Sequence, residues 1–313
     1  MDIVLHEAPF DAGEVLRLWS DVFGPDEAAF EAPQLDGSEA EDNLDLVLTA
    51  RESGTLLGAI HATIPVCAPV LAGLSGMAVA PDARGRGLGR RLFSGILEEI
   101  DRRGVRAAYL GTGNPVAAKL YRSLGFAFLP GSNVMARYAE GDTIDFERAA
   151  FGKAQGDFAV EEGSAAMRIP LIPLTLRRGE QIVLDQNTGF ANSAEMTQIS
   201  CMGLYSAYQK LAARGGRFWG ARDGRGVLGA VMSAAPEPEG PVADFFCCES
   251  FAGAVPLLME RCRSAVGRCR LRLAEADTAK TALAESMGFR EAASSPIRLR
   301  RFSVPGRILE MRD

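Results

Sequence analysis

Apolar residues recur every four positions in one segment of the chain, at Leu88, Leu92, Ile96 and Ile100. Charged residues fill the other side of this segment, so the pattern predicts an amphipathic helix with one face on a sheet. The apolar run Leu74–Val79 comes shortly before and predicts a buried strand. A strand, a turn and a helix therefore follow one another here.

The rest of the first half alternates between strand-like and helix-like segments. Strands are predicted near residues 3–7, 46–51, 56–64, 74–79, 107–112 and 134–138, and helices near 12–23, 90–103 and 115–124. The stretch up to Asn43 is rich in acids and is predicted to be a loop. This order predicts an α/β (α+β mixed) fold, with helices on the faces of a mixed sheet.

The chain also repeats itself weakly. Leu56–Ile60 recurs as Val227–Val231, and Leu120–Phe126 recurs as Leu283–Phe289, in the same order. Two such matches in similar local context favour a duplication, and hence two tandem domains. A linker-like stretch between the halves puts the boundary near Gly156, which gives domains of residues 1–155 and 156–313.

Composition is that of an ordinary globular chain. Of the 313 residues, 47% are hydrophobic and 24% are charged, and the length favours two domains. The net charge of −6 argues against a nucleic-acid-binding protein. Six cysteines without ligand spacing and two histidines suggest neither a disulfide framework nor a metal site. The first residues carry acids where a signal peptide carries lysines, and the apolar runs are too short to span a bilayer, so we expect a cytoplasmic protein without a membrane partner.

Between the predicted strand and helix lies the turn Arg84-Gly85-Arg86-Gly87-Leu88-Gly89. A glycine turn at a helix N-terminus exposes backbone N–H groups and the positive end of the helix dipole, which together bind phosphate. Glycine is needed because a Cβ would block positive φ and keep a diphosphate away from the backbone. The nucleotide P-loop and the dinucleotide fingerprint both fit this spacing poorly. The turn therefore predicts a phosphorylated ligand, against the alternative of a plain loop whose glycines only start a helix.

A second group of residues surrounds the next predicted helix. Asn114 suits the helix cap, Pro115 the first position and Gly125 the C-terminal stop. Asn114 and Tyr121 are seven positions apart, two helical turns, so they point to one side. Both side chains are candidates for facing a ligand along the sheet. The alternative is that Asn114 only caps the helix and Tyr121 only packs.

Four features of the first half, taken together, resemble those of a known family. They are Met77-Ala78-Val79, the turn Arg84–Gly89, Asn114 and the pattern Ala118-x-x-Tyr121-x-x-x-Gly125-Phe126. The family that they resemble is the GNAT superfamily of N-acetyltransferases. The resemblance is specific over Leu74–Phe126 and looser over residues 1–140. The second half resembles a degenerate GNAT domain. The resemblance implies two tandem GNAT-like domains, each a mixed, mainly antiparallel sheet flanked by helices.

By this resemblance the ligand is acetyl-CoA, and no metal takes part. The backbone of Met77 and Val79 would pair with the pantetheine arm like an added strand, Arg84–Gly89 would cradle the pyrophosphate, and Asn114 would contact the pantetheine. Tyr121 would protonate the departing thiolate, which suits a phenol with a pKa near ~10. The expected cofactor-binding residues are Met77, Ala78, Val79, Arg84, Gly85, Arg86, Gly87, Leu88, Gly89, Arg90, Asn114, Ala117 and Tyr121.

The general base is less evident, because the family often has a carboxylate on the strand before the glycine turn and this chain has none from Gly73 to Val79. His61 is the best substitute, and with Tyr121 it completes the predicted catalytic residues. A lone strand histidine can instead be merely solvated. In that case a water chain would carry the proton, or an amine substrate with a low pKa would need no base.

The second half lacks the matching groups. Aligning the repeats places Ala284 opposite Tyr121, and Cys247–Ala252 opposite the glycine turn. Glu249 in that segment would repel phosphate, so we expect no coenzyme A site there. Asp277 still suits a helix cap. We expect this half to shape the acceptor pocket or to complete the sheet of the first domain.

The leading hypothesis is therefore an acetyl-CoA-dependent N-acetyltransferase that acts on a primary amine of a small molecule, with protein amines possible. The acidic loop Asp21–Asp45 either attracts a cationic acceptor or is a mobile surface loop. A non-catalytic acyl-CoA-binding sensor or interaction protein is the alternative, and a longer acyl donor is a third option. The chain is expected to be a monomer or a homodimer.

Overall fold

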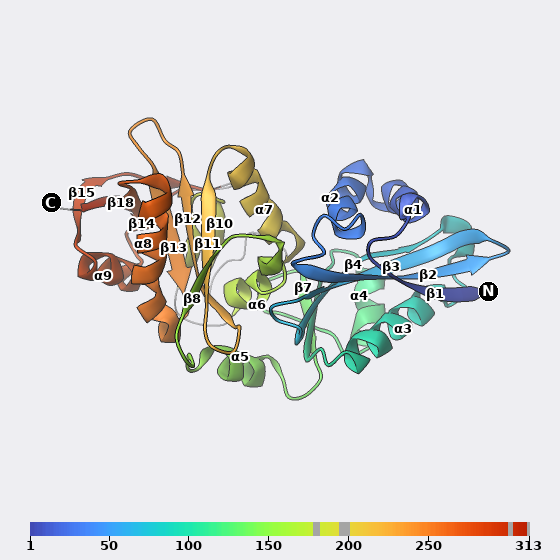
Figure 1. The fold of residues 1–313 in the computed structure, drawn as a ribbon. Helices are drawn as coiled ribbons and strands as arrows, with labels where there is room; N and C mark the ends of the chain where they lie inside the picture. Colours follow the sequence, from blue (N-terminus) through green and yellow to red (C-terminus); the bar gives the residue numbers. More distant parts are fainter. Residues whose placement is uncertain (178–181, 194–200, 300–302, 312–313) are drawn as a thin grey trace. The chain divides into compact units, whose positions relative to one another are not determined.

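A computed structural model describes residues 1–313 except 178–181, 194–200, 300–302 and 312–313. The chain forms two compact units, shown in Figure 1. The first unit contains residues 1–129 and 133–143, and the second contains 130–132 and 144–313. The predicted boundary at residue 155 falls after the first helix of the second unit, α5 (Thr143–Phe151).

The first unit is built on one seven-stranded sheet. Its strands, in spatial order, are β1 (Asp2–Glu7), β2 (Asn43–Glu52), β3 (Thr55–Pro65), β4 (Leu71–Val79), β5 (Ala107–Gly111), β7 (Val134–Tyr138) and β6 (Ala127–Phe128). Neighbouring strands run antiparallel except β4 and β5, which are parallel. All seven strands come from the first unit itself, so the expectation that the second half completes this sheet is wrong.

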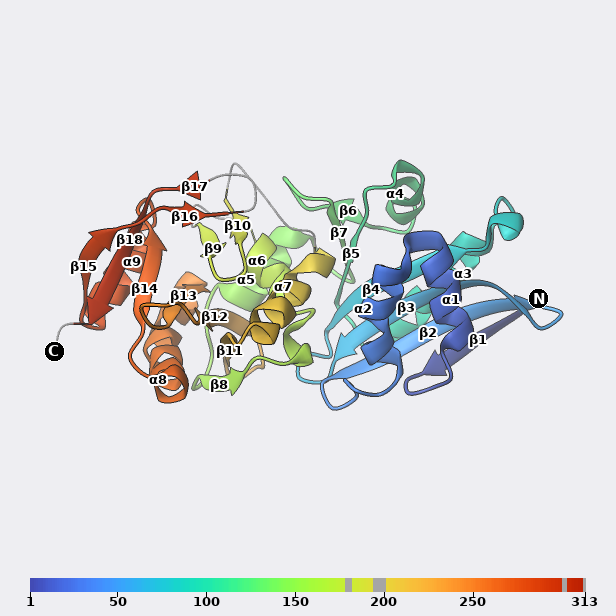
Figure 2. The ribbon, with the colours of Figure 1, turned by 90° about the horizontal axis from the view of Figure 1, so that it is seen from above.

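Helices cover both faces of this sheet (Figures 1 and 2). The helices are α1 (Gly13–Phe23) and α2 (Pro25–Leu35) on one face, and α3 (Leu88–Arg102) and α4 (Pro115–Arg122) on the other. The apolar stripe of α3 is buried against β2, β3 and β4, which confirms the predicted amphipathic helix. On the opposite face, Trp19 and Leu35 are fully buried against Val47 and Ala59.

The predicted acid-rich loop is wrong over residues 25–35, where the chain forms α2. Pro25 stands in the first turn of this helix, where its missing N–H costs nothing. Two of the acids, Glu31 on α2 and Asp45 on β2, are buried rather than exposed. These two carboxylates therefore form part of the interior and not of a mobile surface.

The second unit repeats the strand order and the strand directions of the first. Its sheet runs β8 (Ala159–Glu162), β11 (Arg217–Arg222), β12 (Leu228–Ala235), β13 (Val242–Cys247), β14 (Arg270–Ala274), β18 (Gly306–Met311) and β15 (Phe289–Ser294). The parallel pair, β13 with β14, occupies the place that β4 and β5 hold in the first sheet. The predicted fold class is confirmed, and the common topology supports the proposed duplication.

Helix α8 (Val255–Val266) follows β13, as α3 follows β4 in the first unit. Helix α9 (Thr278–Ser286) follows β14, as α4 follows β5. The other elements of this unit are α6 (Leu171–Leu176), α7 (Cys201–Ala213), the hairpin β9 (Val183–Asp185) with β10 (Phe190–Asn192), and the pair β16 (Ile297–Arg298) with β17 (Ser303–Val304). In the described residues of the chain, no helix is long and apolar enough to cross a membrane.

Candidate active site

Strands β4 and β5 separate shortly after they pair. Their parallel register covers only Leu71–Gly73 with Ala107–Tyr109. From Leu74 to Val79, β4 keeps β3 on one side and has no described strand on the other. An open strand edge offers backbone N–H and C=O groups to an extended ligand. This is the edge on which Met77 and Val79 lie, as the predicted contact requires.

A β-bulge bends β4 within this open stretch. Ala59 pairs with Ala78 but His61 pairs with Ser75, so Gly76 and Met77 together face one residue of β3. Gly76 has a φ of +58°, and a Cβ there would lie 2.5 Å from the indole of Trp19. Glycine is therefore required both by the backbone conformation and by the packing of α1.

The glycine turn leads from β4 into α3. Gly85 and Gly87 have φ values of +77° and +74°, and a Cβ at either position would meet no atom within 4 Å. Gly87 caps α3 without a side-chain hydrogen bond. The six backbone N–H groups from Gly85 to Arg90 have no hydrogen-bond acceptor among the described residues. Free N–H groups at the positive end of a helix dipole, with open space before them, have the chemistry that binds an anion.

The three arginines of this segment are exposed at the rim of the turn. The Arg84 Nε donates a hydrogen bond to the carbonyl of Val79 at 3.1 Å, and the Arg90 Nη2 donates to the Ser123 hydroxyl at 2.8 Å. Arg86 pairs with Glu52 at 2.8 Å, which raises the pKa of Arg86. Since both partners are about half exposed, this ion pair is weak and leaves Arg86 able to change partner.

Asn114 and Tyr121 begin and end α4. The Asn114 side chain accepts hydrogen bonds from the N–H groups of Val116 at 2.9 Å and Ala117 at 3.4 Å, which confirms the predicted cap. Tyr121 is buried, and its ring packs on Phe93 with 4.7 Å between ring centroids. Its hydroxyl forms no hydrogen bond within the part of the chain that the structure describes. Burial raises the pKa of Tyr121 to about 12, so the phenol keeps its proton at neutral pH.

His61 is fully buried, so the interpretation of it as a solvated strand residue is wrong. Its Nδ1 lies 2.6 Å from Glu31 Oε2 and 3.0 Å from the Ser75 hydroxyl, and its Nε2 lies 2.8 Å from Asp45 Oδ1. Burial alone would lower the pKa of His61. The charge of Glu31 and hydrogen bonds to Asp45 and Glu31 outweigh burial and raise this pKa to about 9.

An imidazolium that donates both N–H groups to carboxylates has no lone pair with which to accept a proton. His61 in this state cannot be the simple general base that the sequence suggests. Its partners Glu31, Asp45 and Ser75 were not predicted from the sequence, and they come from α2, β2 and β4. One signal was present: Asp45 stands opposite Thr63 in the antiparallel register, and polar residues on facing apolar strands indicate a buried network.

The second unit shows a different arrangement at the equivalent strands. A short helix, Glu249–Ala254, occupies the place of the glycine turn, and its first turn is closed by a hydrogen bond from Phe251 N–H to the Cys248 carbonyl. β13 pairs with β12 without a bulge. Asp277 caps α9 by accepting from the N–H of Lys280 at 3.0 Å, which confirms that prediction.

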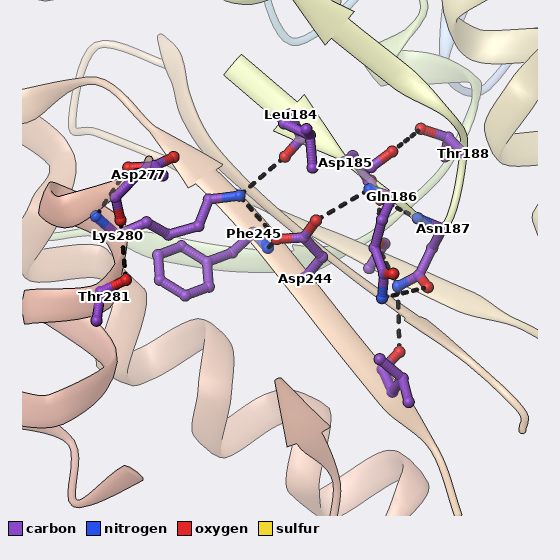
Figure 3. Close-up of polar contacts among 12 residues, drawn as sticks. Leu184, Asp185, Gln186, Asn187, Thr188, Asp244, Phe245, Asp277, Lys280 and Thr281 are labelled. Atoms are coloured by element: carbon purple, nitrogen blue, oxygen red, sulfur yellow. Dashed lines mark hydrogen bonds and ion pairs between the residues drawn. The ribbon is translucent and has the colours of Figure 1, made fainter. Parts of the chain in front are cut away.

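The side chain of Lys280 reaches from α9 to Asp244 on β13 (Figure 3). Lys280 is the third residue of α9, as Ala117 is of α4. Its Nζ donates to Asp244 Oδ1 at 2.7 Å and to the carbonyl of Leu184 at 2.9 Å, and lies 5.5 Å from the centre of the Phe245 ring. A buried ion pair thus joins α9 to β13, and the hydrogen bond to Leu184 joins α9 to β9. The closed turn at Glu249–Ala254 supports the prediction that the second unit has no coenzyme site.

Comparison with known proteins gives a family match in the first unit. Residues 13–126 match the acetyltransferase (GNAT) family. The [ribosomal protein bS18]-alanine N-acetyltransferase of Salmonella typhimurium is 35% identical over 92 residues, which are 29% of this chain and 59% of that protein. The match therefore spans less than two thirds of the relative's length.

Two solved structures are similar in fold to part of the chain. The GNAT family N-acetyltransferase from Escherichia coli in complex with CoA is 23% identical, with a TM-score of 0.34, and the match covers 44% of this chain and 81% of that one. The GNAT family acetyltransferase from Brucella melitensis in complex with acetyl-CoA is 20% identical, with a TM-score of 0.35, and the match covers 45% and 90%.

Proposed function

Because residues 13–126 match the acetyltransferase (GNAT) family, we propose that the protein is an acetyl-CoA-dependent N-acetyltransferase whose acceptor is a primary amine. One observation carries the proposal. Six consecutive N–H groups without acceptors among the described residues, Gly85–Arg90, stand at the start of α3 beside the open edge of β4. A diphosphate joined to an extended amide-containing arm has the chemistry that suits this pair of features.

The residues present fit such a ligand. The open space before Gly85 and Gly87 allows phosphate oxygens to approach the backbone, which a Cβ would prevent. The backbone of Met77 and Val79 would pair with the pantetheine arm along the free edge of β4. Acetyl-CoA would supply the acetyl group as a reactive thioester.

Tyr121 would donate a proton to the departing thiolate. Its phenol is protonated over the physiological pH range and its hydroxyl has no partner among the described residues, so the proton is available to a ligand. The ring is held by Phe93. Positioned proton donors of this kind contribute about 10²- to 10⁴-fold to the rate.

We further propose that the acceptor is a small molecule with a primary amine. A specific observation favours a second candidate, the N-terminal amine of a protein, because the relative from Salmonella typhimurium is named for acetylation of an alanine of ribosomal protein bS18. Both acceptors are primary amines and would undergo the same attack on the thioester.

Release of free thiol from acetyl-CoA, measured with a panel of small primary amines and with peptides that begin with alanine, tests the proposal. We expect turnover with small amines, and turnover only with peptides would select the second candidate. Calorimetry with coenzyme A is the companion measurement. Affinity without turnover on any amine would identify an acyl-CoA-binding sensor instead, and absence of affinity would exclude both functions.

A further inference from the structure

We propose that Ser75, His61 and Glu31 form a proton relay that removes a proton from the ammonium group of the acceptor. The inference rests on the proposed function and names its missing base. No carboxylate occurs on β4 between Gly73 and Val79, where the family resemblance leads one to look for it. The structure instead brings a carboxylate to this strand from α2, through a histidine of β3.

Ser75 occupies the position that contact with an acceptor requires. It directly precedes the bulge residues Gly76 and Met77, and it is partly exposed, whereas His61 and Glu31 are fully buried. The side chains of Met77 and Val79 pack against the hydrophobic core on the α3 side of the sheet. Ser75 contacts His61, and the His61 ring lies 6.0 Å from the Trp19 ring of α1. The side chain of Ser75 therefore lies on the opposite face of the sheet, toward α1. An amine that approaches from the α1 and α2 face would therefore contact Ser75.

The distances connect Ser75 to Glu31 through one atom. The Ser75 hydroxyl lies 3.0 Å from His61 Nδ1, and that nitrogen lies 2.6 Å from Glu31 Oε2. On the other side of the ring, Asp45 accepts from Nε2 and from the hydroxyl of Thr63. The charged groups that face His61 in the described structure are therefore Glu31 from α2 and Asp45 from β2.

Glu31 has room for the proton. Its second oxygen, Oε1, is buried and has no hydrogen-bond partner among the described residues. A buried carboxylate oxygen without a donor is costly, and taking up a proton relieves that cost. With His61 charged, the three side chains Glu31, His61 and Asp45 carry one net negative charge, which one added proton neutralises. The group of Glu31, His61 and Asp45 is thus a proton acceptor that is buried away from solvent. The partly exposed hydroxyl of Ser75 connects this group to a ligand at the surface.

The transfer balances in three linked steps. The proton on His61 Nδ1 first passes to the Glu31 carboxylate, which frees the lone pair of that nitrogen. The hydroxyl proton of Ser75 then passes to His61 Nδ1 as the Ser75 Oγ takes one proton from the acceptor R–NH₃⁺. The products are the neutral amine R–NH₂, an unchanged serine, an unchanged imidazolium and a neutral glutamic acid, which returns its proton to solvent after turnover. In this scheme Ser75 is a catalytic residue, and His61 and Glu31 are positioning residues.

The variant Ser75→Ala tests the relay, because Ser75 is partly exposed and the protein is expected to fold without its hydroxyl. We expect kcat at pH 7 to fall by about 10²-fold with little change in KM for acetyl-CoA. The loss should shrink as the pH rises through the pKa of the amine, since the amine then arrives without its proton. Ser75→Thr, which keeps a hydroxyl, should restore most of the rate. Ser94→Ala, a partly exposed serine on α3, is the matched control and should leave the rate unchanged.

The variant Glu31→Gln is a second test of the proton relay. It keeps the size of the side chain and should show the same pH-dependent loss, with the melting temperature reporting any change in folding. A rate for Ser75→Ala equal to that of the unmodified protein overturns the relay, and so does a loss of the same size at every pH. Turnover by the unmodified protein is measured in the same assay: its absence means that the proposed function fails, whereas its presence with an unaffected Ser75→Ala means that only the relay fails.

Discussion

At the scale of single residues, the charge state of a few buried groups decides what this site can do. His61 is held as an imidazolium by Glu31 and Asp45, with its pKa raised to about 9, and burial keeps Tyr121 a neutral phenol. The two groups therefore enter the proposed reaction with their protons in place. Neither state follows from the residue type, because ordinary histidine is mostly neutral at a pH of about 7.5 and ordinary tyrosine titrates near ~10.

The raised pKa of His61 makes the stability of the protein depend on pH. The folded state keeps the proton up to about pH 9, whereas the unfolded chain loses it near 6.5. The contribution is therefore complete below pH 6.5 and is lost as the pH rises through 9. We expect the free energy of unfolding to fall by up to about 3 kcal/mol across this interval, measured by urea unfolding.

The variant His61→Gln should flatten this pH dependence. The matched control is His6→Gln, because burial lowers the pKa of His6 and its removal cannot abolish a loss of stability that occurs above pH 6.5. Equal slopes for His61→Gln and the unmodified protein between pH 6.5 and 9 would contradict the assignment.

Tyr121→Phe separates catalysis from packing. The ring contact with Phe93 is kept and the lost hydroxyl has no hydrogen bond among the described residues, so the melting temperature should change little. We expect turnover to fall about 10²-fold or more, with coenzyme A affinity nearly unchanged. Tyr138→Phe on β7 is the control. Unchanged turnover in Tyr121→Phe would remove this residue from the mechanism.

At the scale of elements, the strand–turn–helix unit of β4, the glycine turn and α3 creates the proposed anion site. The bulge at Gly76 and the early separation of β4 from β5 expose the strand edge, and Gly87 starts α3 without a side-chain cap. The glycines serve two purposes here: Gly76 makes room for the indole of Trp19, whereas Gly85 and Gly87 leave open space before the backbone. Only the latter two are expected to matter directly for ligand affinity.

Gly87→Ala tests this distinction. The new Cβ meets no atom of the protein within 4 Å. The positive φ is expected to cost about 1 kcal/mol of stability. We expect coenzyme A affinity, measured by calorimetry, to fall by about 10- to 100-fold, as for the loss of a charge-assisted hydrogen bond. Gly104→Ala has the same strain, with a φ of +84° and open space, but stands after the far end of α3. Similar affinity losses in both variants would show that strain, not phosphate contact, is responsible.

Local sequence patterns predicted these helices and turns well, but they predicted poorly which side chains are buried together. The stripe of α3, the cap of α4 at Asn114 and the glycine turn depend on neighbours within a few positions, and all are present. Helix α2 was missed because its acids indicated a loop, and only tertiary packing makes a buried position for Glu31. The ligand contacts of Met77, Asn114 and the arginines stay predictions.

At the scale of the whole molecule, one topology occurs twice with different contents. Both sheets have the same strand order, with one parallel pair at the same place. In the first unit the parallel pair opens beside a glycine turn. In the second, Lys280 and Asp244 form a buried ion pair there, and burial raises the pKa of Asp244 to about 7 although Lys280 lowers it. The same strand order thus surrounds a proposed ligand site in the first unit and a buried ion pair in the second.

This difference predicts the stoichiometry of ligand binding. Calorimetric titration should give one coenzyme A per chain, because the anion site of Gly85–Arg90 has no counterpart in the described part of the second unit. Gly87→Ala should weaken that single site rather than reveal another. Two equivalents of coenzyme A per chain would contradict the assignment of the second unit.

The sequence by itself determined the features that are encoded locally: the amphipathic helix, the glycine turn before it, the caps at Asn114 and Asp277, and the repeated order of elements. The tertiary structure alone decided which charges are buried together. Glu31, Asp45, Ser75 and His61 come from four elements, and the pKa of a group depends on the distance and burial of its neighbours rather than on their order in the chain.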